Sequence, residues 1–387
     1  MFQRKYSKLL KECKDKYKAI ALLGPRQSGK TTLSKYCFPE YEYFSLENPD
    51  TRMRAQEDPR QFLGSIKSNC ILDEIQNTPE LLSYLQEILD SKLDNRKFIL
   101  TGSNSFQINE KISQSLAGRV RIVTILPLLP SEIPIEQRTT SLDQALYTGL
   151  YPRIFNESLS PETWYADYYN TYIQKDVRSL LAIKDMLQFD RFIRVCAGRV
   201  ACISEYSSMA SEVGISQPTA VSWSSVLESS YLIFRLQPHF KNFNKRIIKS
   251  PKIYFYDTGL LCYLLRIQSP DQLATHPLRA AIFENWVVSI LQKIFICKGK
   301  EAPTYFWRDQ HGHEVDILLD KSSLLFPIEI KSGSTFTNEW IKTLNWFSNL
   351  QGTSDTALIY GGTDLFKFKE CSVISWSKIE EKVEEFL

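Results

Sequence analysis

A glycine-rich run near the amino terminus has the residue types needed to bind phosphate. It contains, in order, Gly24, Pro25, Arg26, Gln27, Ser28, Gly29, Lys30, Thr31 and Thr32, which is the pattern G-x-x-x-x-G-K-T. Its glycines let the backbone fold back so that amide N–H groups face an anion. Lys30 would reach the β- and γ-phosphates of a nucleotide, and Thr31 would ligate Mg²⁺. The run therefore predicts a phosphate loop.

The residues on either side of this run agree with that prediction. An apolar stretch at 19–23 predicts a buried strand before the loop, and 32–36 predicts a helix after it. A strand, a glycine-rich turn and a helix in this order place the positive end of the helix toward a bound anion.

Two acids follow the next strongly apolar stretch. Cys70, Ile71 and Leu72 precede Asp73 and Glu74, which predicts a buried parallel strand with carboxylates at its carboxyl end. Beside a phosphate loop, Asp73 would hold the Mg²⁺ shell and Glu74 would polarise the attacking water. The alternative is a strand that simply ends in solvent-exposed acids.

A further strand, 97–104, ends in small polar residues. A hydroxyl or amide there can sense the γ-phosphate and orient water, so Thr101, Ser103 and Asn104 are all candidates. The sequence does not choose firmly among them; we take Asn104 as the catalytic candidate. The alternative for each residue is a turn rich in small side chains.

Arg119 follows Gly118, the predicted end of a helix. An arginine here could reach the γ-phosphate of a neighbouring subunit, which would make the protein a homo-oligomer. A surface arginine at a helix end is the equally weighted alternative.

The whole chain has an ordinary composition and suggests two or three domains. It has 387 residues, a net charge of +3, eight cysteines without close pairing and four histidines. These values argue against a globally basic nucleic-acid binder and against a zinc site. No signal-peptide core or run of about 18 apolar residues is found, so we expect no membrane span and a cytoplasmic location.

We expect an α/β protein of four parts. Residues 1–135 predict a parallel sheet with helices on both faces, and 136–185 an aromatic-rich helical region. Residues 186–262 predict a winged helix-turn-helix, with its turn at Gly214 and a helix cap at Ser216. Residues 263–387 predict a second α/β core, which ends in an acidic helix at 378–387 that we expect to be a solvated face.

The proposed wing carries the local basic residues. They are Lys241, Lys245, Arg246, Lys249 and Lys252, which could track the phosphates of DNA or RNA. The predicted recognition helix, from Gln217 to about Ser229, has no arginine or lysine. Its candidate contacts are Gln217, Thr219, Ser222 and Ser224. Winged helices also bind proteins, so a protein partner stays open.

Four residues of the last part have the types and order of a Mg²⁺-dependent nuclease site. Asp316 and Glu329 would hold the metal, Glu284 would support it, and Lys331 would activate water or stabilise the transition state. Glu329 and Lys331 share one face of a strand because they are two residues apart. The alternative is a structural ion-pair cluster in an inactive descendant of that fold.

The order of these motifs resembles prokaryotic AAA-family ATPases with a C-terminal domain of undefined role. The segments that carry the resemblance are 24–32, 72–76, 100–104, 116–120, 149–152, 172–177, 251–260, 283–285, 306–308, 314–316 and 328–333. Leu150 departs from the pattern, which usually has a second glycine there. The resemblance implies ATP binding and a nuclease-like C-terminal fold, without a known substrate.

Two functions fit these expectations. The first is Mg²⁺-dependent ATP hydrolysis coupled to nucleic-acid handling by the winged-helix and nuclease-like domains. The second is a nucleotide-dependent switch that binds a protein partner and whose nuclease-like domain is inactive.

Overall fold

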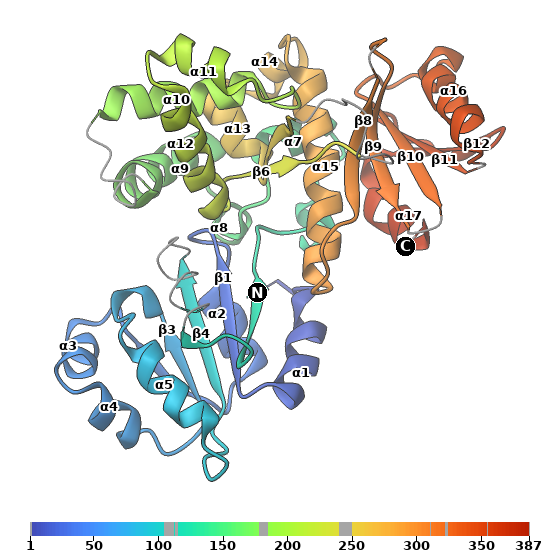
Figure 1. Ribbon diagram of the computed structural model, residues 1–387. Coiled ribbons are helices and arrows are strands. Elements are labelled where there is room, and N and C mark those ends of the chain that lie inside the picture. Colours follow the sequence, from blue (N-terminus) through green and yellow to red (C-terminus); the bar gives the residue numbers. More distant parts are fainter. Residues whose placement is uncertain are drawn as a thin grey trace.

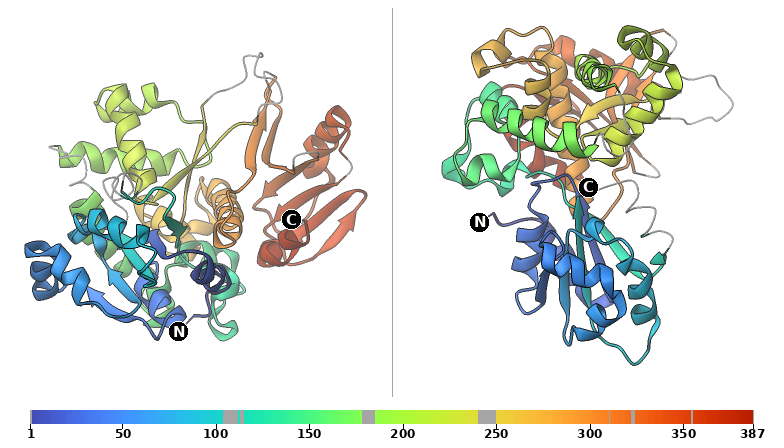
Figure 2. Two further views of the ribbon diagram at one scale, coloured as in Figure 1. Left: turned by 60° about the horizontal axis from the view of Figure 1, so that its bottom comes forward. Right: turned by 90° about the vertical axis from the view of Figure 1, so that its left-hand side faces the viewer.

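The structure is a computed structural model that describes residues 2–103, 112, 115–177, 185–239, 250–309, 311–321, 324–353 and 355–386 (Figure 1). The amino-terminal sheet lies at one end of the molecule, and the middle and carboxyl-terminal regions lie beside each other at the other end (Figures 1 and 2). The mixed α/β fold expected from the sequence is confirmed.

The amino-terminal sheet has five parallel strands in the order β2-β3-β4-β1-β5. Their bounds are Ala19–Gly24 for β1, Glu42–Ser45 for β2, Cys70–Asp73 for β3, Phe98–Ser103 for β4 and Val120–Thr124 for β5. Every residue of β1, β3 and β4 is buried. Because the strands are parallel, the phosphate loop after β1 and the acids after β3 lie at the same edge.

Helices cover both faces of this sheet because β1 is apolar on both sides. Ile20 and Leu22 belong to one core with Tyr6 and Leu33, whereas Ala21 and Leu23 belong to another. The first core includes α1 (Tyr6–Lys16) and α2 (Lys30–Cys37). The second includes α4 (Pro59–Ser65) and α5 (Leu81–Asp90); α3 (Pro49–Glu57) and the short helix η1 (Ile75–Asn77) complete this region.

The middle region is helical. It contains η2 (Pro130–Glu132), η3 (Ile135–Gln137), α7 (Leu142–Thr148), α8 (Pro152–Asn156), α9 (Pro161–Tyr168), the π-helix η4 (Tyr169–Val177), α10 (Met186–Gly198), α11 (Tyr206–Val213), α12 (Gln217–Ser229), α13 (Thr258–Leu264) and α14 (Pro270–Ala274). Strands β6 (Ile233–Leu236) and β7 (Lys252–Phe255) pair antiparallel after α12. The aromatic stripe from Trp164 to Tyr172 is buried, as a core stripe should be.

The carboxyl-terminal region is a mixed six-stranded sheet in the order β12-β13-β11-β10-β9-β8. Its elements are α15 (Arg279–Cys297), β8 (Thr304–Arg308), β9 (Glu314–Asp320), β10 (Leu325–Lys331), η5 (Asn338–Ile341), α16 (Lys342–Gln351), β11 (Thr356–Tyr360), β12 (Phe366–Phe368), β13 (Cys371–Ser375), η6 (Trp376–Lys378) and α17 (Ile379–Phe386). Helix α15 runs between this sheet and the middle region (Figure 1).

Helix α15 is the one helix of the described chain that is long and apolar enough to cross a membrane. That result rests on length and composition alone, and 72% of its apolar window is buried inside the protein. Its packing is that of a core helix, so the expected absence of a membrane span stays a prediction.

The expectation that the acidic carboxyl-terminal helix is merely a solvated face is wrong. Ile379 and Val383 of α17 are buried, and Glu380 accepts hydrogen bonds from the backbone N–H (2.7 Å) and hydroxyl (2.5 Å) of Ser131. The apolar pair lies four residues apart on one helical face, which is a signal of packing. The helix therefore joins the carboxyl-terminal region to η2.

Candidate functional site

Two glycines let the phosphate loop adopt a conformation and a close contact that other residues could not. Gly24 has φ +152°, and a Cβ atom there would lie 2.1 Å from the carbonyl oxygen of Ile125. Gly29 has φ +90° and directly precedes α2. A side chain at Gly24 would collide with backbone, so the glycine allows the close approach of β1 to the chain after β5.

Lys30 is buried within the loop. Its Nζ donates to the carbonyl oxygens of Gly24 (3.1 Å) and Pro25 (2.8 Å), and burial lowers its pKa to about 8. These two carbonyl oxygens accept the hydrogen bonds of the ammonium group. The oxygens of a bound phosphate could replace them.

Three hydroxyl groups converge on Asp73. Thr31 Oγ1 donates to Oδ1 at 2.8 Å, Thr101 also donates to Oδ1, and Tyr43 donates to Oδ2 at 2.7 Å. Mg²⁺ prefers hard oxygen ligands, and Thr31 and Asp73 supply a hydroxyl and a carboxylate within one hydrogen bond of each other. The donor set therefore fits Mg²⁺ as the sequence predicts.

Glu74 lies at the next position in a left-handed backbone conformation, with φ 57°. Gln76 Nε2 donates to the Glu74 carboxylate and to Ser103 Oγ (2.9 Å), and the Glu74 backbone N–H donates to Thr101 Oγ1 at 3.2 Å. This backbone region is sparsely populated by residues other than glycine, asparagine and aspartate. The turn directs the carboxylates of positions 73 and 74 to different partners.

The structure gives the sensor candidates different surroundings. Thr101 contacts Asp73, and Ser103 Oγ lies 3.4 Å from a Glu74 carboxylate oxygen. Asn104 lies outside the described residues. The catalytic role assigned to Asn104 therefore stays a prediction.

A cavity of about 540 Å³ opens over the loop. Gly29, Lys30, Thr31, Thr32, Gln27 and Glu74 line it together with Phe2, Arg4, Pro152, Arg153 and Asn156. The last five come from the amino terminus and α8, and sequence reasoning missed them. Within the loop, the Ser28 side chain is buried. Arg26 is exposed, and its guanidinium lies 5.9 Å from the ring centre of Tyr172.

Arg4 holds the phosphate loop in place through hydrogen bonds to the backbone. It is buried and donates to the carbonyl oxygens of Ser28 (2.8 Å) and Leu126 (2.7 Å), and its Nε lies 3.0 Å from Glu132. This arginine connects the phosphate loop, the chain after β5 and η2.

Arg119 lies far from the phosphate loop of its own chain. It directly precedes Val120, which pairs with Ala19 at the amino end of β1, whereas the loop follows the carboxyl end. Six strand residues span about 20 Å. The Arg119 guanidinium pairs with Asp90 (Nε–Oδ1 2.5 Å, Nη2–Oδ2 2.9 Å) near the surface. Any role in hydrolysis would have to be exerted on another subunit.

The acids of the carboxyl-terminal region form an ion-pair cluster with β7. Lys252 is buried, and its Nζ lies 3.1 Å from Glu284 and 2.5 Å from Glu314. Tyr254 donates to Glu284 at 2.6 Å. Burial raises the pKa of Glu284 to about 7, and Asp316 adds to the effect. Counting Lys252 with the basic wing is therefore wrong.

Asp316, Glu329 and Lys331 continue this cluster. Ile330 N–H donates to Asp316 Oδ2 at 2.8 Å, and Lys331 Nζ donates to Glu329 Oε1 at 2.5 Å. Glu329 Oε2 is buried without a hydrogen-bond partner, and burial raises the Glu329 pKa to about 8. Within the described part of the chain, no group of three or more His, Cys, Asp or Glu residues is placed to hold a metal. The three acids nevertheless lie close enough that the negative charges of Asp316 and Glu284 help to raise the pKa of Glu329, and their role in holding a metal stays a prediction.

Two helices, α11 and α12, flank the turn at Gly214, and their assignment to a winged helix-turn-helix stays a prediction. Gly214 has φ 80° between α11 and α12, and Ser216 accepts a hydrogen bond from Thr219 N–H at 3.2 Å. Ser224, which the sequence suggested as a contact, is buried and lies 3.0 Å from the Tyr206 hydroxyl. Lys241, Lys245, Arg246 and Lys249 lie outside the described residues.

Three family models match consecutive parts of the chain. Residues 16–133 match the AAA domain, 139–271 match a domain of unknown function (DUF8612), and 279–379 match another (DUF4143). The AAA match covers the phosphate loop, Asp73 and Glu74.

Individual proteins resemble the chain to different degrees. It is 30% identical over 321 residues to the uncharacterized proteins Mb2031c of Mycobacterium bovis and Rv2008c of Mycobacterium tuberculosis, across 82% of this chain and 70% of each relative. The Walker-type ATPase PABY2304 of Pyrococcus abyssi matches 68% of this chain and 96% of its own, with 15% identity and a TM-score of 0.39. The chain belongs to the family of Mb2031c and Rv2008c, and it carries an amino-terminal AAA domain followed by two domains of unknown function.

Proposed function

We propose that this chain binds ATP with Mg²⁺ in the cavity above the phosphate loop and hydrolyses the γ-phosphate. One observation carries the proposal: Asp73 is hydrogen-bonded to Thr31, while the adjacent Glu74 is held separately by Gln76. In this proposal Asp73 holds the metal and Glu74 polarises the water, both at the sheet edge that carries Lys30.

The residues have distinct roles in this proposal. Bound Mg²⁺ supplies charge neutralisation at the phosphates, and Thr31 and Asp73 are the residues that would hold it. Lys30 exchanges the carbonyl oxygens of Gly24 and Pro25 for phosphate oxygens. Glu74 orients the attacking water and accepts its proton, a role that suits a carboxylate held by a side-chain amide.

Substitution of Lys30 tests the proposal. Lys30→Ala should reduce ATP turnover at least a hundredfold because the lysine faces the transferred phosphoryl group. Lys67→Ala is the matched control, since Lys67 is exposed and donates only to Gly64 O at 3.2 Å. Equal turnover by Lys30→Ala and wild-type protein would refute hydrolysis at this loop.

The downstream role that we propose for ATP turnover is nucleic-acid handling by a homo-oligomer in the cytoplasm. Its support is the succession of α11, the turn at Gly214, α12 and the β6–β7 pair, with Gln217 and Ser222 exposed on α12. Wild-type ATP turnover measured with and without duplex DNA and RNA tests it. Unchanged turnover, together with no salt-dependent binding to either, would favour the protein-binding switch.

A second candidate activity is Mg²⁺-dependent cleavage of phosphodiester bonds in the carboxyl-terminal region. The observation that favours it is the unpartnered Oε2 of Glu329, since a buried carboxylate oxygen without a partner fits a bound cation. Asp316 and Glu329 would hold the ion, and Lys331 would act on the water. The ion pairs of Lys252 and Lys331 support the alternative, in which these residues form a structural cluster and the carboxyl-terminal region cleaves no nucleic acid.

Two readouts separate these alternatives. Under the cleavage proposal, Mg²⁺ raises the thermal unfolding midpoint of wild-type protein but not of Glu329→Gln, and Lys331→Ala loses DNA or RNA cleavage. Lys367→Ala, which changes an exposed lysine on β12, is the control. No Mg²⁺-dependent cleavage and no difference in Mg²⁺ stabilisation between wild-type and Glu329→Gln would leave the ion-pair cluster as a structural feature.

A further inference from the structure

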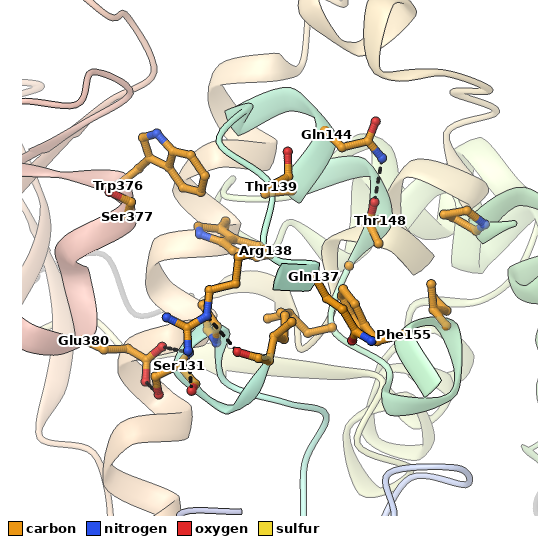
Figure 3. A pocket seen from close by; sticks show the side chains of 18 of the residues that line it. Ser131, Gln137, Arg138, Thr139, Gln144, Thr148, Phe155, Trp376, Ser377 and Glu380 are labelled. Carbon is orange, nitrogen blue, oxygen red and sulfur yellow. Dashed lines mark hydrogen bonds between the residues drawn. The ribbon is translucent and has the colours of Figure 1, made fainter. Parts of the chain in front are cut away.

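A second cavity of about 570 Å³ lies between the middle and carboxyl-terminal regions (Figure 3). Its walls come from η2, η3 and the following loop, from α7 and α8, from α15, and from η6 and α17. Protein interiors are close-packed, and cavities of 300–1,000 Å³ are typical of small-molecule sites. The phosphate-loop cavity has a different lining, so this space is a separate site.

The lining is mostly apolar. It includes Ile133, Ile154, Phe155, Leu159, Trp286 and Trp376. Figure 3 shows Trp376 on one side of the cavity and Phe155 on the other, with Gln144 hydrogen-bonded to Thr148. Such a wall favours a ligand with a flat or branched apolar body.

Trp286 gives this apolar wall one hydrogen-bond donor without an acceptor. Its side chain is 2% exposed, and its indole Nε1–H has no hydrogen-bond partner. A buried tryptophan N–H usually has an acceptor, and leaving it unpaired is unfavourable. A ligand that brings an acceptor to Trp286 would satisfy this group.

Arg138 lies at the end of the cavity formed by η2 and α17, where Lys378 and Glu381 are ion-paired with each other at 2.8 Å. Arg138 donates to the carbonyl oxygens of Ile133 (2.7 Å) and Ser131 (2.8 Å), and no described carboxylate pairs with it. The nearby Glu380 is already bonded to Ser131 and ion-paired with Lys5 at 3.1 Å. Figure 3 shows Arg138, Ser131 and Glu380 grouped together. Arg138 is therefore the cation available to an anionic ligand.

We propose that this cavity binds a small amphipathic anion: a molecule with an aromatic apolar body, one anionic group directed to Arg138, and a hydrogen-bond acceptor for Trp286. The apolar wall supplies most of the affinity through burial, and Arg138 selects the charge. The site does not depend on ATP hydrolysis, so the two proposals fail or hold independently.

Two fluorescent probes test the site on the full chain. The anionic probe is 8-anilinonaphthalene-1-sulfonate, and its neutral counterpart is N-phenyl-1-naphthylamine. We expect one saturable site for the anionic probe and weaker binding of the neutral one. Arg138→Gln should weaken the anionic probe about tenfold, as expected for loss of a charge-assisted contact, and leave the neutral probe within about twofold.

Two more variants give the controls. Arg60→Gln changes an exposed arginine of α4 and should match wild-type protein. Ala145→Trp places a large side chain at a buried lining position and should abolish binding of both probes. If Ala145→Trp does not fold, as judged by circular dichroism, Thr139→Trp at the same cavity replaces it.

The contrary results are equally definite. Non-saturating binding, unchanged binding to the cavity-filled variant, or equal effects of Arg138→Gln and Arg60→Gln would each overturn the proposal.

Discussion

Thr31 donates its hydroxyl to Asp73 across 2.8 Å, joining the phosphate loop to the end of β3 over 42 sequence positions. Parallel strands bring these two residues to one sheet edge, although nothing local in the sequence links them. This contact is the geometric core of the proposed ATP site.

Tyr43 is a positioning residue for Asp73. Its hydroxyl donates to Oδ2 at 2.7 Å, and its ring lies 3.4 Å from Lys35 Nζ. Tyr43→Phe removes one hydrogen bond to a carboxylate, worth roughly 1 kcal/mol at this partly exposed position. We expect the KM for Mg·ATP to rise about fivefold with kcat nearly unchanged. Tyr36→Phe, on an exposed ring, should have no effect, and equal KM values for all three proteins would exclude this role.

Arg4 should be among the most important residues for stability in the amino-terminal region. It is 6% exposed, as is its ion-pair partner Glu132, and it donates to two backbone carbonyl oxygens. Arg4→Met leaves the buried Glu132 carboxylate with two backbone N–H donors but without its cationic partner, so we expect roughly 3 kcal/mol of destabilisation in chemical unfolding. Arg54→Met, on an exposed arginine of α3, is the control. A loss comparable to that of the control would show that Arg4 is dispensable.

Variants of the Arg119–Asp90 pair distinguish two roles of Arg119: action on the ATP site of a neighbouring subunit, and a structural ion pair within its own chain. Arg119→Ala and Asp90→Ala break the same surface ion pair, but only the first removes the guanidinium. If Arg119 acts between subunits, only Arg119→Ala lowers ATP turnover, and wild-type turnover per chain rises with protein concentration. Equal turnover by both variants would assign the arginine to the surface pair alone.

The buried acids predict a pH dependence of unfolding. Burial raises the pKa of Glu329 from 4.5 to about 8. Between these values the folded protein retains a proton that the unfolded chain has lost, so this contribution to stability is complete below about pH 4.5 and is lost as the pH rises to 8. In Glu329→Gln the side chain is neutral throughout, so this variant should gain stability relative to wild-type protein with rising pH.

Thermal unfolding from about pH 5 to 9 in EDTA measures this difference. Glu301→Gln, on an exposed acid, is the control. Parallel curves for wild-type protein and Glu329→Gln would contradict the raised pKa.

The sequence predicts those parts of the site that are local. The glycines, Lys30 and Thr31 form one continuous motif, and Asp73 and Glu74 directly follow an apolar strand. Phe2, Arg4 and Arg153 were not predictable because they reach the same cavity from distant segments without a motif of their own. Tyr43 carries no signal either, since an aromatic residue on a strand is usually a packing residue.

For the ion-pair cluster of the carboxyl-terminal region, strand positions were predictable from the sequence but long-range contacts were not. The positions of Asp316, Glu329 and Lys331 on β9 and β10 were predictable from strand periodicity. The sequence gives no indication that Lys252, which follows a basic stretch, is buried against Glu284 and Glu314. Tertiary packing decided the role of this lysine.

The most direct test of the central claim is the turnover and nucleotide binding of Glu74→Gln. The account predicts that this variant binds Mg·ATP as tightly as wild-type protein but hydrolyses it at least a hundredfold more slowly, because its amide cannot accept the proton of water. Glu57→Gln, an exposed acid on α3, should behave as wild-type protein. Hydrolysis by Glu74→Gln at the wild-type rate would contradict the account.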